Sequence, residues 1–129
     1  MSSFTTPLIC ELLPDGKNYK IYERFTYRIG SETSQRRVET EVGFITDLAS
    51  TWPFGWLVPP NGKYGKAAVT HDDLCKNKRI MNGNIAEHCT RAEADAIFLE
   101  AMGVLKVPKL LRYTMYTLVR GYAIATGKK

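Results

Sequence analysis

Hydrophobic and polar residues alternate along the first third of the chain, and this period of two predicts β-strands. The segments 7–13, 19–29 and 37–44 are predicted strands, and turn-forming residues fill 14–16 and 30–34 between them. The side chains expected to face the core are Tyr19, Ile21, Phe25, Tyr27, Ile29, Val38, Val42 and Phe44. Those expected to face solvent are Lys20, Arg24, Thr26, Arg28, Arg37, Glu39 and Glu41. Three strands joined by short turns are most simply an antiparallel meander.

Residues 46–62 interrupt this pattern with a long loop that contains three prolines and two tryptophans. Loops of this length in a compact domain are often functional. We interpret Trp52 and Trp56 as side chains that pack at the edge of the core, and contact with a ligand or lipid is the alternative. A catalytic site would need this loop to leave an open cleft, whereas a structural role would let the two indoles fill the space.

After the loop, apolar residues recur at the three- and four-residue spacing of amphipathic helices. The predicted helices span 63–78, 90–103 and 108–127, and Thr90 with Glu93 forms a capping box at the start of the second. The inward stripe of the first helix is Tyr64, Ala67, Ala68, His71, Leu74 and Cys75. The inward stripe of the second is Ala94, Asp95, Phe98, Ala101 and Met102. Strands followed by three helices predict an α+β fold.

The composition is that of an ordinary globular domain, with 44% hydrophobic and 24% charged residues. At 129 residues the chain suits a single domain, 1–129, whose core can form without a disulfide or a structural metal. Cys10, Cys75 and Cys89 are an odd number of cysteines without framework spacing, which indicates reduced thiols in a cytosolic protein. The sequence predicts neither a secretory signal peptide nor a membrane span, so we do not expect an integral membrane protein.

The net charge of +5 favours anionic partners only slightly. Lys109, Arg112, Tyr116 and Arg120 would share one face of the last helix. We interpret this face as solvated, with a patch for nucleic acid or phosphate as the alternative, and we do not expect nucleic acid to be a partner.

The most concentrated chemistry is a pair of polar residues inside two apolar stripes, His71 and Asp95. A lone buried carboxylate is costly, so the two side chains are expected to meet across the helix–helix contact. A carboxylate that binds one imidazole nitrogen fixes the tautomer and leaves the other nitrogen as a base. The same pair could instead be a satisfied polar contact that orders the core, and spacing alone does not separate these interpretations.

Asp72 follows His71 directly and could face carbonyl oxygens of the preceding loop, and Asp47 could bring a second carboxylate to the same place. Carboxylates beside backbone carbonyls suit a hard cation such as Ca²⁺, so Asp72 and Asp47 are the candidate metal ligands. The alternative for Asp47 is a turn residue that caps nearby N–H groups. Asp73 is expected to be solvated.

Two other chemistries use cysteine. His71 and Cys75 are four residues apart on one helix face, and His88 and Cys89 follow, so zinc is an alternative. The paired spacings that zinc sites favour are missing. A Cys75 thiol activated by His71 is a further alternative, but on a core stripe Cys75 is interpreted as a small hydrophobic residue.

The order of these segments resembles an uncharacterised family of phages and prophages, known as domain of unknown function 1353. The resemblance covers about residues 15–125 and rests on three segments, 43–50 (GFITDLAS), 62–72 (GKYGKAAVTHD) and 91–102. Where that family usually shows Ser-x-Pro-Arg after its Thr-Asp motif, this chain has Ser50-Thr51-Trp52-Pro53. The resemblance implies a phage origin.

A looser resemblance, over about residues 60–125, is to the helical core of phospholipase A2. The segments 67–75 and 91–98 are similar to its two central helices, and 113–121 is similar to the final helix of the bacterial members. This resemblance implies His71 as general base, Asp95 as its orienting partner and Asp72 as a calcium ligand, with the cation stabilising the oxyanion. The calcium loop and disulfides of that family are absent, and Cys75 replaces a usual Tyr.

We therefore expect a phage-encoded hydrolase that acts on an ester in lipid or cell envelope, with Ca²⁺ as its only cofactor. The alternative is a non-catalytic virion, tail or assembly protein that binds other phage proteins and in which the His71–Asp95 pair is structural. Either protein would be made in the host cytoplasm and could enter the virion.

Overall fold

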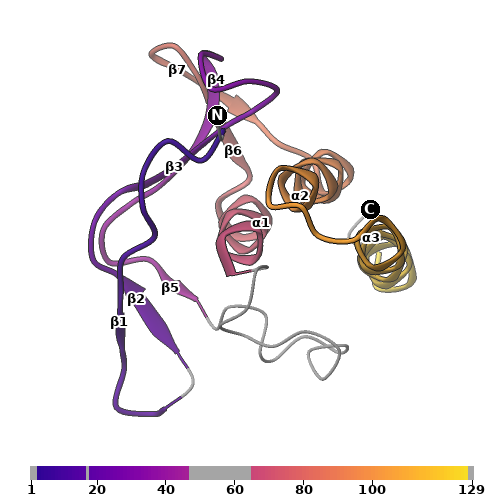
Figure 1. Ribbon diagram of the computed structural model, residues 1–129, viewed down its shortest axis with the longest axis horizontal. Helices are drawn as coiled ribbons and strands as arrows, with labels where there is room; N and C mark the ends of the chain where they lie inside the picture. The colour runs from indigo at the N-terminus through magenta and orange to yellow at the C-terminus, as the bar shows by residue number, and fades with distance from the viewer. Residues whose placement is uncertain (1–2, 17, 47–64, 128–129) are drawn as a thin grey trace.

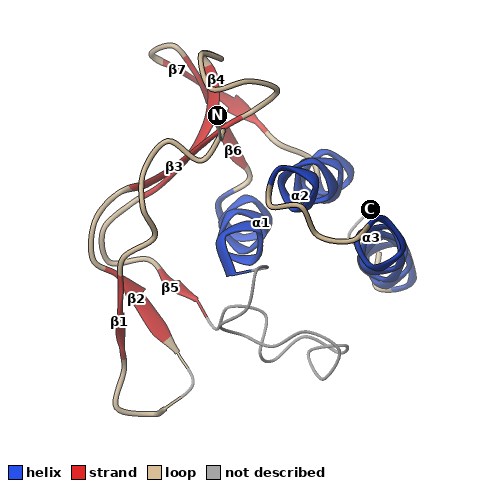
Figure 2. Ribbon diagram, viewed as in Figure 1, coloured by secondary structure: helices blue, strands red, loops and turns tan. Residues whose placement is uncertain are grey.

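The computed structural model describes residues 3–16, 18–46 and 65–127. Antiparallel strands form two small sheets, and three helices lie in a row beside them (Figure 1). The first helix is next to the strands, the second packs on the first, and the third packs on the second. The predicted α+β class is confirmed, and Figure 2 shows that all three helices gather on one side of the strands.

The smaller sheet is built from β1 (Cys10–Leu12), β2 (Tyr19–Ile21) and β5 (Ile45–Thr46), in the order β1-β2-β5. The turn between β1 and β2 contains Gly16 at a φ of 76°. This left-handed conformation favours glycine, which has no Cβ to clash with the backbone.

The larger sheet is built from β3 (Phe25–Arg28), β4 (Arg36–Thr40), β6 (Arg79–Asn82) and β7 (Ile85–His88), in that order across the sheet. Every pairing in both sheets is antiparallel. The β6–β7 hairpin lies between the first and second helices in the chain and pairs with β4.

The expected antiparallel strands precede the helices, but the segment 19–29, predicted as one strand, forms two strands. Residues 22–24 separate β2 from β3, and the two strands belong to different sheets. Val42 is 64% exposed, contrary to prediction, because it lies in a turn between β4 and β5. Thr26 is buried, also contrary to prediction, because residues 3–6 pass alongside β3 and Thr6 Oγ1 accepts a 2.9 Å hydrogen bond from its backbone N–H.

The three helices are α1 (Gly65–Asn77), α2 (Arg91–Val104) and α3 (Lys109–Ala125). The predicted capping box of α2 is confirmed, since Thr90 Oγ1 accepts from the Glu93 N–H and the Glu93 carboxylate accepts from the Thr90 N–H. No helix within the described ranges is both long and apolar enough to cross a bilayer.

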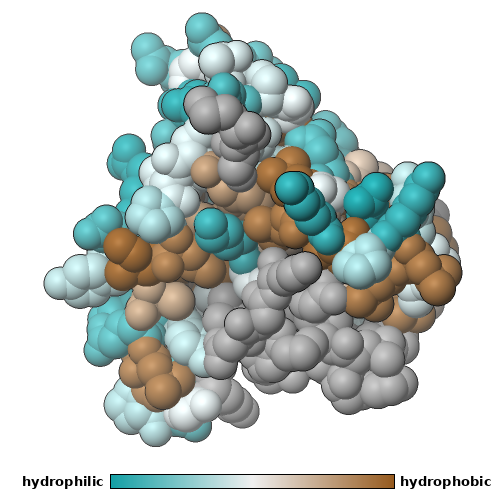
Figure 3. Space-filling model, in the orientation of Figure 1, coloured by the Kyte–Doolittle hydropathy of each residue, from teal (hydrophilic) through white to brown (hydrophobic). Residues whose placement is uncertain are grey.

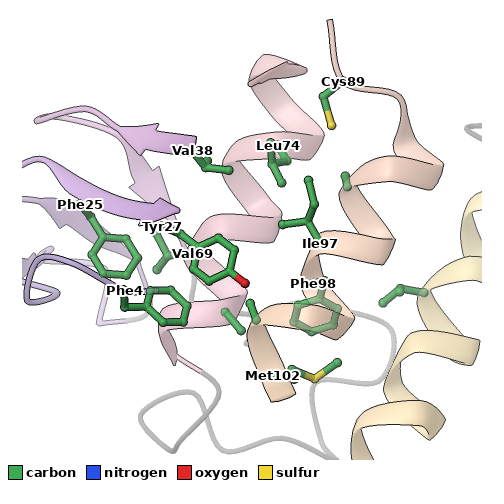
Figure 4. Packing of buried hydrophobic residues seen from close by; sticks show 14 of the residues in the cluster. Phe4, Phe25, Tyr27, Val38, Val69, Leu74, Cys89, Ile97, Phe98 and Met102 are labelled. Carbon is green, nitrogen blue, oxygen red and sulfur yellow. The ribbon is translucent and has the colours of Figure 1, made fainter. Parts of the chain in front are cut away.

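The hydrophobic core lies where the larger sheet, α1 and α2 meet (Figure 4). Its aromatic side chains are Phe4, Phe25, Tyr27 and Phe98, and its aliphatic ones include Val69, Leu74, Ile97 and Met102. The Tyr27 hydroxyl donates to the carboxylate of Glu100 on α2, which also accepts from the Gly30 N–H at 2.8 Å. This contact ties the larger sheet to α2.

Candidate functional site

His71 and Asp95 meet between α1 and α2, in the interior of the molecule. Nε2 of His71 and Oδ1 of Asp95 are 2.6 Å apart, and the two side chains are 2% and 0% exposed. The Phe98 ring packs against the imidazole, with 4.6 Å between the ring centroids. Because both residues occupy helix positions that otherwise carry apolar side chains, packing the helices brings them together. The predicted contact is confirmed, and its catalytic role stays a prediction.

Two arginines flank the Asp95 carboxylate, and sequence reasoning had assigned neither to the site. Arg91, one turn earlier in α2, donates from Nε to Oδ1 of Asp95 over 3.0 Å. Arg120, on α3, places Nε 3.4 Å from Oδ2 of the same carboxylate. The arginine side chains are 14% and 17% exposed. Asp95 therefore connects all three helices, to α1 through His71 and to α3 through Arg120.

The charges around the pair decide its protonation state. Burial disfavours the imidazolium and lowers the pKa of His71 below 6.5, and the nearby Asp95 only partly opposes this effect. Burial alone would raise the pKa of Asp95, but His71 and Arg91 bind and stabilise its ionised form and hold the pKa below 3.8. At neutral pH the pair is thus a carboxylate beside a neutral imidazole. Nε2–H donates to Asp95, and Nδ1 is the basic nitrogen.

Cys75 lies beside the imidazole, where the sequence placed it. Its Sγ is 3.5 Å from Nε2 and 3.9 Å from Nδ1 of His71. Burial raises the pKa of the Cys75 thiol to about 12, so the thiol is protonated at neutral pH. A protonated, buried thiol is a poor nucleophile, and this favours the interpretation of Cys75 as a small hydrophobic residue.

The zinc alternative can be judged from the same atoms. Within the described part of the chain, ligand atoms of His71, Cys75 and Asp95 lie within 4.8 Å of one another. The other expected ligands are not in this group: His88 is exposed on β7, and the Cys89 thiol donates to a backbone carbonyl at 3.3 Å. The two arginines on Asp95 exceed its negative charge by one, and this positive charge opposes a cation at this point.

The candidate calcium ligands are only partly described. Asp72 is mostly buried, and its Oδ2 lies 3.4 Å from Nζ of Lys76, one turn later on α1. Asp47, with the loop that carries Trp52 and Trp56, lies outside the described residues. Calcium needs six to eight oxygen ligands. Asp72 is the one expected ligand that the structure describes, and it faces an ammonium group, so the calcium site stays a prediction.

Asp73 is buried, and the prediction that it is solvated was wrong. Its side chain accepts hydrogen bonds from Oγ1 of Thr40 on β4, at 2.8 Å, and from Nδ2 of Asn77. Burial raises the pKa of Asp73, and the two hydrogen bonds oppose that rise. The error arose because α1 is covered on two sides, by α2 and by β4, and one apolar stripe does not reveal the second contact.

The predicted solvated basic face of α3 is correct for Lys109 alone, which is exposed. Arg112, Tyr116 and Arg120 are partly buried. Arg112 Nη1 donates to the Val107 carbonyl at 3.2 Å, and Arg120 faces Asp95. The packing of α3 against α2 thus places Arg120 beside Asp95, in the candidate site.

The comparisons with known proteins give one match. No curated protein and no solved structure is significantly similar to this chain. A family model described as "Protein of unknown function (DUF1353)" matches residues 19–119, which include β2, β3, all of α1 and α2, and most of α3. The chain therefore belongs to the DUF1353 family.

Proposed function

We propose that this chain is an ester hydrolase in which His71 is the general base and Asp95 positions it. The observation that supports the proposal is the buried hydrogen bond from the neutral imidazole of His71 to the carboxylate of Asp95. This bond uses Nε2 as the donor and leaves Nδ1 as the nitrogen that can act as a base. The resemblance to the phospholipase A2 core assigns these residues the same two roles. The substrate class that we propose is an ester of lipid or cell envelope, and the setting is a phage infection.

The reaction uses one proton transfer in each direction. Nδ1 of His71 takes a proton from water while the water oxygen bonds to the carbonyl carbon of the ester. The imidazolium then gives this proton to the leaving alkoxide as the C–O bond breaks, which releases an acid and an alcohol. Asp95 stays ionised and stabilises the transient imidazolium through Nε2. His71 ends the cycle neutral, as it began.

Calcium stays a prediction, and no step of this reaction is routed through it. Asp72 is the one described residue of the expected ligand pair, and it is paired with Lys76. If a cation joins Asp72 and Asp47, it would supply positive charge for the developing oxyanion. Comparing the reaction rate in CaCl₂ with that in excess chelator tests this part independently of the His71–Asp95 pair.

A second function, a non-catalytic phage virion, tail or assembly protein, is favoured by the burial of the pair. His71 is 2% exposed and Asp95 is fully buried, and the carboxylate connects three helices. Such a contact also serves a protein whose only need is a rigid helical layer. This function predicts no turnover by the wild-type chain and a stoichiometric amount of it in purified particles.

The test uses the two histidines of the chain as a matched pair. The wild type, His71→Gln and His88→Gln are assayed on p-nitrophenyl butyrate and on phosphatidylglycerol vesicles. His88 is exposed on β7, so His88→Gln controls for the loss of an imidazole elsewhere. We expect His71→Gln to lower kcat by about 100-fold or more, the usual contribution of a general base. Equal rates for the wild type and His71→Gln, or no turnover by the wild type on either ester, would overturn the hydrolase proposal.

A further inference from the structure

We infer that Arg91 and Arg120 form a binding site for a phosphate-class oxyanion beside the His71–Asp95 pair. The oxyanion is either a group carried by the substrate of the proposed hydrolase or a free ion. The first source rests on the proposed function, whereas the site itself does not.

The hydrogen-bonding capacity of the two guanidinium groups is largely unused. A guanidinium has five N–H donors in a planar fork. Arg91 donates to Asp95 through Nε, and Arg120 approaches it through Nε. Within the described part of the chain, neither arginine has a hydrogen bond through its Nη groups. A partly buried guanidinium that lacks acceptors for its Nη donors is a natural partner for an anion with several oxygens.

The local charge supports the same inference. Asp95 contributes one negative charge, and Arg91 and Arg120 contribute two positive charges, so the cluster has an excess of one positive charge. Asp72, the other acid near the imidazole, is paired with Lys76. The excess charge is held by side chains less than one-fifth exposed, where water screens it only in part.

Arg120 approaches Asp95 as an ion pair but makes no hydrogen bond to it. Arg–carboxylate pairs that stabilise a fold are often bidentate, with two parallel N–H···O bonds. Arg120 is 3.4 Å from Oδ2, and among the described residues that oxygen accepts no hydrogen bond. Arg91 alone would balance the charge of Asp95. The second guanidinium therefore has charge and donors for which the described structure provides no acceptor.

Because the two arginines come from different helices, the site is formed only when α2 and α3 are packed together. The fork of Arg91 is fixed by its hydrogen bond to Asp95, one turn away on the same helix. The guanidinium of Arg120 belongs to α3, which packs against α2 and has Met115, Val119 and Ala123 as its buried residues. An oxyanion bound by both guanidinium groups would join the helices and raise the thermal stability of the chain.

The test titrates inorganic phosphate into the full chain by isothermal calorimetry, with sodium acetate as a comparison. The variants are Arg91→Lys and Arg120→Lys, which keep the positive charge opposite Asp95 and lose the planar fork. Arg112→Lys is the matched control, since Arg112 is also a partly buried arginine of α3 but donates to a backbone carbonyl. Thermal unfolding of each variant shows that the fold is kept.

We expect the wild type and Arg112→Lys to bind phosphate with a dissociation constant on the order of 1 mM or tighter. Arg91→Lys and Arg120→Lys should each bind it about tenfold more weakly, and phosphate should raise the Tm of the wild type more than theirs. No binding by the wild type, equal binding by all four chains, or binding of acetate as tight as that of phosphate would overturn the inference.

Hydrolysis assays then separate the two sources of the oxyanion. If the anion belongs to the substrate, Arg120→Lys lowers kcat/KM for a phosphate-bearing ester by a larger factor than for a neutral ester with the same acyl group. If the oxyanion is a free ion, inorganic phosphate changes the rate with both esters, and Arg120→Lys weakens that effect. Arginine-dependent phosphate binding without hydrolysis of any ester would support the anion site and reject the proposed function.

Discussion

Oγ1 of Thr40, on β4, donates a 2.8 Å hydrogen bond to Oδ2 of Asp73, on α1. Asp73 is 4% exposed, and its second oxygen accepts from Asn77 on the same helix. The carboxylate thus fastens α1 to the larger sheet, two residues from His71. Because α1 also packs on α2, this contact helps to hold the imidazole at a constant distance from Asp95.

Replacing Asp73 by Ala should lower the free energy of unfolding by about 2 kcal/mol, because Thr40 and Asn77 would lose a buried acceptor. Asp73→Asn, which keeps an acceptor oxygen, should cost less. Urea denaturation followed by circular dichroism measures both variants.

The Asp73 variants also carry a pH signature. Burial raises the pKa of Asp73 in the folded chain above its ordinary value of 3.8, so the unfolded chain loses this proton at lower pH. The carboxyl therefore stabilises the fold most when protonated, and that contribution falls as the pH rises from 3.8 through the raised pKa. Relative to Asp73→Asn, the wild type should lose stability across this window. If the difference in free energy of unfolding between the wild type and Asp73→Asn does not change with pH, the pKa of Asp73 is not raised in the folded chain.

Asp95→Asn should be among the most destabilising single substitutions on the helices. It removes the buried charge that faces Arg91 and Arg120, and uncompensated buried charges cost about 3–5 kcal/mol. Glu87→Gln is the control, because Glu87 forms an exposed ion pair with Arg36 at 3.4 Å and such pairs contribute less than about 1 kcal/mol. Urea denaturation of both variants at pH 7 measures the contrast, and equal losses would show that Asp95 is not the charge centre of the helical layer.

The contact between His71 and Asp95 could be predicted because two polar residues stood in apolar stripes on neighbouring helices. Arg120 could not, since an arginine on a helix surface is ordinarily solvated and only the rotation of α3 against α2 brings it to Asp95. Nor does the spacing of α1 reveal that Asp73 meets Thr40, because that contact depends on how the sheet lies across the helix.

The β6–β7 hairpin and the break between β2 and β3 could both have been predicted from individual residues, although the hydrophobic pattern alone does not reveal them. Gly83-Asn84 is a two-residue hairpin signal, and these two residues form the turn of the unpredicted β6–β7 hairpin, with Gly83 at a φ of 60°. Glu23 occupies an inward position of the segment 19–29, where a continuous half-buried strand would place an apolar residue. The residues expected to face the core before and after Glu23 all occupy odd-numbered positions, so the alternation continues through it. The pattern therefore predicts one strand at the point where the chain passes from one sheet to the other.

Cys75→Ser should keep the proposed esterase activity, because the thiol of Cys75 has a pKa of about 12 and takes no part in the reaction at neutral pH. The native protein should also resist alkylation of Cys75 by iodoacetamide at pH 8, whereas the protein unfolded in urea should react readily. Mass spectrometry of peptides from the two samples measures the extent of alkylation. Rapid native alkylation of Cys75, with loss of activity, would instead indicate a thiol nucleophile.

His71 should make both rate and stability depend on pH below the neutral range. Its folded pKa is lowered below 6.5, so as the pH falls below 6.5 the unfolded chain binds a proton before the folded chain does. The free energy of unfolding should therefore keep its full His71 contribution above pH 6.5 and lose it as the pH falls below that value. Chemical denaturation of the wild type and His71→Gln measures this contribution as a difference that shrinks towards acid pH.

The proposed hydrolysis should follow the same group, because only the neutral imidazole can accept a proton from water. The value of kcat/KM for p-nitrophenyl butyrate should stay level from pH 8 to about 6.5 and fall only at lower pH, with a midpoint below that of an ordinary histidine. His88→Gln should show the same profile, since His88 is exposed on β7 and is not part of the His71–Asp95 pair. A midpoint above 6.5 would mean that Asp95 outweighs burial and that His71 is the charged partner of a conventional ion pair.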